Sequence, residues 1–188
     1  MSARPPSGAP RTRALGTPTL LGACHDASSS FLRGPAEAPA AIRRELQSTM
    51  SNAWSEALQL VEPGVAWVDG GDVALGEAPR AAIERAVDGL LQAGGRPFVL
   101  GGDHSITYPV LRAVRRHHPA LTILHLDAHN DLYDDFEGDR FSHACPLARI
   151  MEEGLAEQLV QVGIRAMSRH QREQADRFGV EVIDMRRW

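Results

Sequence analysis

The chain has 188 residues, of which 43% are hydrophobic, and a formal net charge of −4. This length and composition predict one globular domain, and the dispersed charges exclude the footprint of a nucleic-acid-binding or anionic-membrane protein. No apolar run approaches the roughly 18 residues that a membrane helix needs, so we expect a small soluble ligand and no nucleic acid or membrane among the partners.

The N-terminal segment and the cysteines bear on the cellular location of the protein. Cys24 and Cys145 are far apart and lack metal or redox spacing, which argues against a disulfide framework and predicts a cytoplasmic protein. Residues 1–18 are rich in Pro, Arg, Ser and Ala and contain no acid, so they predict a disordered arm before a domain over residues 19–188. A transit peptide is the alternative, but the prolines would break its amphipathic helix.

Short apolar runs alternate with helical patterns along the rest of the chain. Strands are expected over residues 19–23, 65–68, 97–100, 121–126, 159–164 and 180–183, and helices over 38–48, from Pro79 through Leu91, 106–117, 146–154 and 168–178. Residues 25–34 are expected to form a loop and residues 69–72 a turn. This order predicts an α/β fold whose parallel sheet is covered on both faces, with ligand-binding loops at the carboxyl ends of its strands.

Two of these loops carry metal-ligand residues. The strand over residues 121–126 runs into Asp127-Ala128-His129-Asn130-Asp131, and the preceding strand runs into Gly101-Gly102-Asp103-His104-Ser105. Residues two apart in extended chain point the same way, so Asp127, His129 and Asp131 can converge on one ion. Carboxylate and imidazole donors suit Mn²⁺, Zn²⁺ or Fe²⁺. The alternative is that these residues merely cap the following helices.

The segment 141–146 is a third loop that precedes a helix. His143 could move protons beside a metal, because an imidazole titrates near neutrality, although a capping or surface histidine is the simpler interpretation. Cys145 could be a nucleophile, but a cysteine before proline at a helix start is more often a small buried residue. The acidic residues between 134 and 139 form a solvated loop that could also attract a cationic substrate.

Gly101 and Gly102 raise the question of nucleotide binding. They lack the later glycine of a dinucleotide fingerprint and the lysine of a phosphate loop. We therefore expect them to permit a close backbone approach near the metal.

Together these residues resemble the ureohydrolases: arginases, agmatinases, guanidinobutyrases and formimidoylglutamases. The resemblance runs from Thr19 to Trp188 and is carried by the segments 101–105 and 127–131. It implies a three-layer α/β/α arginase-like fold with a mainly parallel sheet, and a homo-oligomer. It also implies two Mn²⁺ ions, with His104 and Asp131 on one, His129 on the other and Asp127 between them. The implied reaction uses a hydroxide held by the ions to split a guanidino group into urea and an amine.

Finer features of the resemblance concern the substrate. Ser142-His143 is similar to the agmatinase Ser-His-Gly motif, which makes His143 a candidate for proton transfer or substrate orientation, although Ala144 replaces the glycine. Tyr133 stands where arginases usually carry Asn, which resembles agmatinases and makes Tyr133 a candidate substrate-binding residue. We therefore expect a small cationic guanidino substrate such as agmatine, with guanidinobutyrate, arginine and formimidoylglutamate as alternatives.

The chain departs most from the family in its C-terminal part. Family members contain a later Asp-x-Asp motif that supplies metal ligands, and a later Glu that binds the guanidinium; neither is found here. We expect C-terminal strands of the family sheet to be missing and the isolated chain to be inactive. The alternatives are a non-catalytic fragment or subunit of the family, and a deacetylase-like metal hydrolase of related fold.

Overall fold

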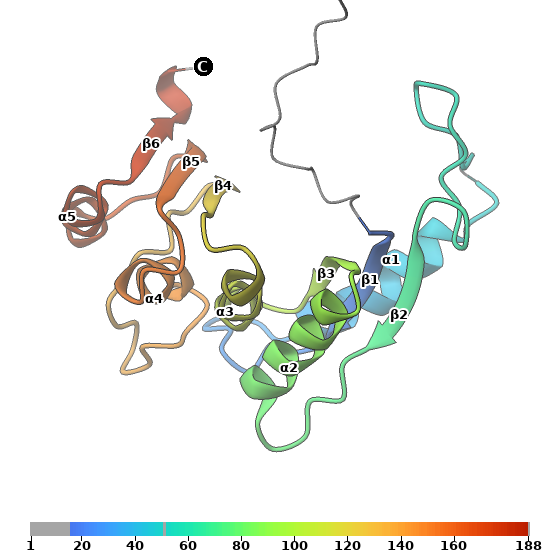
Figure 1. Ribbon diagram of the computed structural model, residues 1–188. Helices are drawn as coiled ribbons and strands as arrows, with labels where there is room; N and C mark the ends of the chain where they lie inside the picture. The colour runs from blue at the N-terminus through green and yellow to red at the C-terminus, as the bar shows by residue number, and fades with distance from the viewer. Residues whose placement is uncertain (1–15, 51, 188) are drawn as a thin grey trace, which may run out of the picture.

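The computed structural model describes residues 16–50 and 52–187, in which strands and helices alternate (Figure 1). The strands are β1 (Pro18–Ala23), β2 (Val68–Asp72), β3 (Arg96–Gly101), β4 (Thr122–Leu126), β5 (Gln158–Ile164) and β6 (Glu181–Asp184). The α-helices are α1 (Ala38–Leu46), α2 (Pro79–Gln92), α3 (Thr107–His117), α4 (Pro146–Glu152) and α5 (Arg169–Phe178). Short 3₁₀ helices are η1 (Pro35–Glu37), η2 (His104–Ile106) and η3 (Met185–Arg187). The predicted arm lies outside the described residues except for its last three, and Pro18 already belongs to β1.

One predicted strand is displaced. The strand expected over residues 65–68 is instead β2, formed largely by the Asp69-Gly70-Gly71-Asp72 segment that was expected to turn. It pairs parallel to β1 with an irregular register. Glycine makes this possible, because a Cβ on Gly70 would lie 2.8 Å from a methyl carbon of Leu21. Arg43 on α1 binds the carboxylates of Asp69 and Asp72 and holds this polar strand in place.

The pairing of the strands confirms an α/β fold with parallel strands, but they form two sheets rather than one. The first sheet has the order β2-β1-β3 and the second has the order β4-β5-β6, and every pair of neighbouring strands is parallel. β3 and β4 are therefore edge strands, although α3 connects them directly in the chain. Figure 1 shows them at the inner edges of the two sheets.

Each sheet packs against its own hydrophobic core. Ile83, Val87 and Leu91 of α2 are buried with Leu21 of β1, as the apolar face of α2 predicts. Leu147 and Ile150 of α4 are buried with Leu159 of β5 in the second core. The helix α5 is bounded by a capping box at Ser168 and by Gly179 in the left-handed conformation. Among the described residues, no helix is both long and apolar enough to cross a membrane.

Candidate metal centre

Metal-ligand side chains meet at the carboxyl ends of β3 and β4. His104 lies in η2, just after β3, whereas His125 and Asp127 lie at the end of β4 and Asp131 follows four residues later. One donor atom from each lies within 4.8 Å of the others, close to the span of up to about 4.4 Å between two ligands of one ion. Asp131 has a positive φ of 47°, which is uncommon for a residue with a side chain and typical of functional sites.

The individual contacts show how the cluster is held. His104 Nδ1 lies 2.6 Å from Asp131 Oδ2, and the rings of His104 and His125 stack with centroids 5.3 Å apart. The carboxylate of Asp127 lies between two imidazoles, with Oδ2 3.5 Å from His125 Nε2 and Oδ1 3.5 Å from His129 Nδ1. Asp127 therefore has one carboxylate oxygen near each of these two imidazoles.

The same contacts shift the protonation of these groups. Burial lowers the pKa of His104, but the hydrogen bond and negative charge of Asp131 outweigh burial and leave the pKa above its ordinary value. Burial and the neighbouring His104 both lower the pKa of His125. Burial raises the pKa of Asp127, but the hydrogen bond from the backbone N–H of His129 and the nearby histidines lower it by more. The pKa of Asp127 therefore lies below its ordinary value. Asp127 is thus held as a carboxylate, the form that binds a cation.

His129 is the most open of the predicted ligands. Its side chain is 64% exposed, and its backbone N–H donates to Asp127 Oδ1 at 2.9 Å. A bridge to Ala166, just after β5, fixes its backbone. His129 therefore lies on the solvent-exposed side of Asp127, where its ring is accessible to an ion.

His125 was not among the sequence-based candidates. The alternation that singles out Asp127, His129 and Asp131 extends back by one step to His125, but the residue falls within the predicted strand. Gln161 Nε2 donates to the carbonyl of Asn130 at 2.7 Å and lies 3.1 Å from His125 Nδ1. Because the Asn130 carbonyl fixes the orientation of the amide, Nδ1 accepts and Nε2 carries the proton toward Asp127. Nε2 lies 3.5 Å from Asp127 Oδ2 and has no hydrogen-bond partner among the described residues, so His125 stands beside this carboxylate without a hydrogen bond to it.

The predicted site residues line a single pocket of about 500 Å³. His104, Asp127, His129 and Asp131 lie on one side, and Tyr133, Phe136 and His143 also line it. The carboxylates give the pocket a negative wall, whereas Tyr133 and Phe136 are aromatic. A pocket of this composition can accept a small cation with a flat head group.

Tyr133 contacts α5, and His143 contacts the loop after β1. The ring of Tyr133 stacks on His170 of α5, with centroids 5.8 Å apart. His143 Nδ1 lies 2.8 Å from the carbonyl oxygen of Ser28, and Nε2 lies 3.4 Å from Ser30 Oγ. The loop after β1 thus holds the imidazole of His143, and its role in proton transfer stays a prediction.

Two supporting residues were also missed. Asp103 Oδ1 accepts from the N–H of Ser105 and caps η2, while Oδ2 accepts from the N–H of Ser28 at 2.9 Å. Arg149 on α4 is buried and donates to the carboxylate and carbonyl of Asp134 at 2.8 and 2.9 Å. The Asp-x-Ser spacing signals the cap, but nothing local in the sequence shows that a helical arginine reaches back to this loop.

The glycines of the 101–105 segment permit close packing against neighbouring parts of the chain. A Cβ on Gly102 would lie 2.0 Å from the carbonyl oxygen of His25, and one on Gly101 would meet Ile106. The expected close backbone approach is therefore present at Gly102, and its neighbour is the loop after β1.

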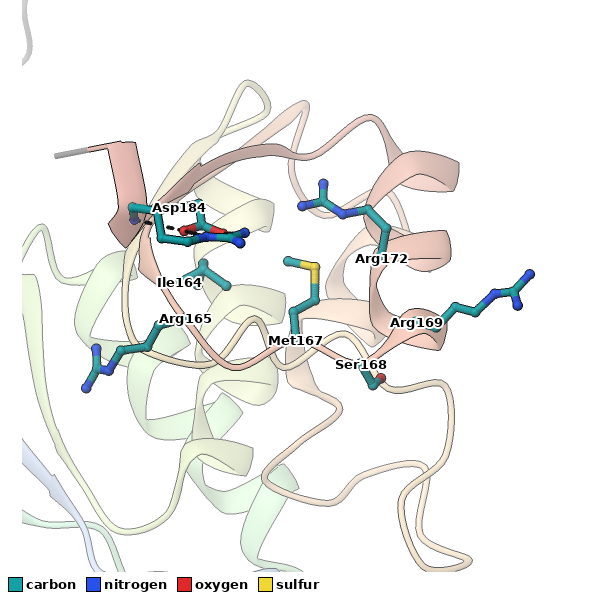
Figure 2. Close-up of a pocket in the computed structure, with 8 residues that line it drawn as sticks. Ile164, Arg165, Met167, Ser168, Arg169, Arg172 and Asp184 are labelled. Carbon is teal, nitrogen blue, oxygen red and sulfur yellow. Dashed lines mark hydrogen bonds and ion pairs between the residues drawn. The ribbon is translucent and has the colours of Figure 1, made fainter.

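A second pocket of about 540 Å³ lies beyond the carboxyl ends of β5 and β6 (Figure 2). It shares Met167 and Ser168 with the metal pocket. Arg165 and Arg169 point away from it in Figure 2, and Arg186 pairs with Asp184. None of the predicted site residues lines this second pocket.

Comparisons with known proteins agree with this geometry. The model of the Arginase family matches residues 17–188. Arginase 1, mitochondrial, of Arabidopsis thaliana is 45% identical over 89% of this chain and 52% of its own length. The N(1)-aminopropylagmatine ureohydrolase of Thermus thermophilus is 37% identical over 87% of this chain and 56% of its own. The arginase structure from Medicago truncatula superposes with a TM-score of 0.86 at 40% identity, over 92% of this chain and 57% of that one.

These comparisons show how finely the protein can be classified. The chain spans about half the length of the relatives it matches. A closer likeness to agmatinases than to arginases is not confirmed, because plant arginases reach 45% identity. The family model, the relatives and the fold nevertheless agree, and the chain belongs to the arginase family of ureohydrolases.

Proposed function

We propose that this chain provides His104, Asp127, His129 and Asp131 to a two-manganese site that hydrolyses a guanidino group to urea and an amine. The observation that carries the proposal is the convergence of donors from β3 and β4 on one pocket. Imidazole nitrogens and carboxylate oxygens fit hard and borderline divalent ions. Bound Mn²⁺ would lower the pKa of water and stabilise developing negative charge.

The residues around the ligands have separate tasks. His125 lies beside Asp127, with Nε2 3.5 Å from Oδ2, and adds a further imidazole to the cluster. Tyr133 and Phe136 provide an aromatic wall on which a planar guanidinium can lie. His143 reaches the same pocket and is the candidate to move a proton to the departing amine.

Arginine is the first candidate substrate. Several relatives between 42% and 45% identical are named arginases. Agmatine, or an aminopropyl derivative of it, is the second candidate, supported by the Thermus thermophilus relative and by the aromatic Tyr133 in the pocket. A cytoplasmic location and a homo-oligomeric complete protein are also proposed, although some of these arginases are named mitochondrial.

Titration of the purified chain with Mn²⁺, followed by electron paramagnetic resonance, tests the site. His129→Asn and Asp127→Asn are expected to weaken binding at least about tenfold, because each removes a ligand. His125→Asn is expected to weaken it less, because His125 lies beside Asp127 but is not one of the four proposed ligands. His118→Asn is the control, since His118 is exposed at the end of α3. Unchanged binding in both His129→Asn and Asp127→Asn would refute the site.

The reaction and its substrate need a complete domain. A fusion of this chain to the remainder of the Medicago truncatula arginase is expected to release urea from arginine faster than from agmatine. The reverse ranking would favour the second candidate. No urea from either, with Mn²⁺ bound, would refute the proposed activity.

A further inference from the structure

Residues 134–140 fold as a short hairpin, which is called the 134–140 arm below. At its tip, the backbones of Phe136 and Asp139 exchange hydrogen bonds of 3.3 and 3.1 Å. The two residues between them, Glu137 and Gly138, have φ values of 55° and 83°. Positive φ at both central residues is typical of the two-residue turns that join antiparallel strands. The tip of the arm therefore has a defined conformation.

A buried arginine closes the base of the arm. Arg149 of α4 is 3% exposed, and its Nη1 donates to the carbonyl oxygens of Asp134 and Arg140 at 2.9 and 3.4 Å. Its Nη2 donates to Asp134 Oδ1 at 2.8 Å, and its Nε lies 3.0 Å from Glu152 Oε2. A planar guanidinium offers these donors in a fixed geometry. One side chain thus ties the first and last residues of the arm to a helix of the second core.

Phe136 is the side chain that the arm presents to the metal pocket. It lines that pocket, whereas the other residues of the arm do not. Its ring centroid lies 5.3 Å from that of Tyr133 and 5.7 Å from that of His143, which are ordinary spacings for aromatic pairs. Phe136 therefore contacts both residues that the sequence marks for substrate binding and proton transfer.

We propose that Phe136 is a substrate-contacting residue that raises the affinity of the pocket, and that Arg149 is the positioning residue that holds it there. The proposal rests on the proposed function, because it concerns the same pocket and the same guanidino substrates. A guanidinium is planar and cationic, and the face of an aromatic ring attracts such a group. An arm fixed at its base and at its tip places the ring before the substrate arrives, so binding does not have to order it.

The two arginines at the base of the arm have different tasks. Arg140 also binds Asp134 Oδ1, at 2.7 Å, and reaches Glu152 at 3.1 Å, but it is 49% exposed and these contacts are with side chains. Arg149 is buried, and it alone of the two donates to the backbone at both ends of the arm. Removal of Arg149 should therefore release the arm, and removal of Arg140 provides a matched control.

Fluorine NMR of the chain tests the positioning without any reaction. The five phenylalanines are replaced by 4-fluorophenylalanine, and the Phe136 signal is the one that disappears in Phe136→Leu. Arg149→Met should move this signal toward its position in urea-unfolded chain, because the neighbouring rings no longer surround it. The signal of Phe178, which packs against the second core, should stay in place and show that the chain is folded. Arg140→Met should leave both signals unchanged. A Phe136 signal that does not move in Arg149→Met would overturn the positioning role.

Gly138→Ala disturbs the arm independently of Arg149 and is the second variant if Arg149→Met does not fold. A Cβ at Gly138 would meet nothing within 4 Å, but the φ of 83° is strained for alanine. Only the turn of the arm is therefore affected. The Phe136 signal should shift in this variant too, and an unchanged signal would refute the arm as the support of Phe136.

Kinetics of the complete domain test the substrate contact. In the fusion with the remainder of the Medicago truncatula arginase, Phe136→Ala should raise the KM for arginine or agmatine at least about tenfold and change kcat less than about threefold. Arg149→Met should raise KM in the same direction. The double variant should be no worse than Phe136→Ala, because Arg149 acts through Phe136. Additive increases, or a fall in kcat at constant KM, would overturn the proposal.

Failure of the proposed function gives a different result. In that case the unsubstituted fusion releases no urea, while the fluorine signals still decide the role of Arg149. The contact is then judged by adding arginine or agmatine at high concentration to the labelled chain. A shift of the Phe136 signal without a shift of the Phe178 signal supports the contact, and the absence of any shift refutes it.

Discussion

The two faces of the β4-β5-β6 sheet have similar apolar sequences but opposite surroundings. On one face, Leu159 is 1% exposed and packs with Leu147 and Ile150 of α4. On the other, Leu124 is 64% exposed. The difference shows that an apolar pattern identifies residues suited to burial but does not show what buries them. The helix-covered face should therefore behave as a folded core, and the open face as a surface.

The largest expected contrast concerns cysteine reactivity on the covered side. Burial raises the pKa of the Cys145 thiol to about 12. At pH 8 its thiolate fraction is then roughly 10³-fold smaller than that of a free thiol with a pKa of about 8.5. Native chain should therefore label at Cys145 with iodoacetamide about a thousandfold more slowly than urea-unfolded chain, as peptide mass spectrometry can measure.

Rapid labelling of native Cys145 would contradict its burial and would reopen the nucleophile hypothesis. Cys24, which is only partly buried, is the internal comparison in the same sample.

The second contrast uses one substitution on each face. Leu159→Ala should lower the free energy of unfolding by about 3 kcal/mol, because it leaves a cavity in a packed core. Leu124→Ala should change it by less than about 0.5 kcal/mol, because an exposed side chain loses few contacts. Urea denaturation followed by circular dichroism measures both. Equal losses would mean that the open face is covered in the isolated chain.

The third contrast uses buried and exposed arginines in one network. Arg149→Met should cost about 2 kcal/mol, because Asp134 loses a charged partner and two loop carbonyls lose a donor. Arg140→Met should cost less than about 0.5 kcal/mol, because Arg140 is 49% exposed. Denaturation gives the energies, and hydrogen exchange in residues 133–144 should rise in Arg149→Met alone. Comparable losses in the two variants would contradict the anchoring role of Arg149.

Much of the architecture could be predicted from periodicity. The apolar runs that became β1, β3, β4 and β5 lie in short segments bounded by turns, and the face of α2 is marked by Ile83 and Val87. β2 was displaced because its stability comes from pairing with β1 and from Arg43, which is distant in the sequence. The division into two sheets was not predicted either, because pairing between strands is a long-range property.

The residues of the site also divide into those that local sequence identifies and those that only the fold brings into place. His104, Asp127, His129 and Asp131 stand in short segments after strands, so local spacing was enough to select them. His125 lies inside a strand pattern, and its role depends on Gln161 and Asn130. Arg149 lies in a helix pattern, and its role depends on a loop nine to fifteen residues earlier. Such contacts become visible only when the chain is folded.

Gly102 shows how far the position of His143 depends on a residue without a side chain. Its backbone lies so close to His25 that any Cβ would push the loop after β1 outward. That loop is tied to Asp103 through the His25 carbonyl and the Ser28 N–H, and the Ser28 carbonyl in turn meets His143 Nδ1. A methyl group added at Gly102 would therefore displace the imidazole of His143 in the pocket, although His143 belongs to a different segment of the chain.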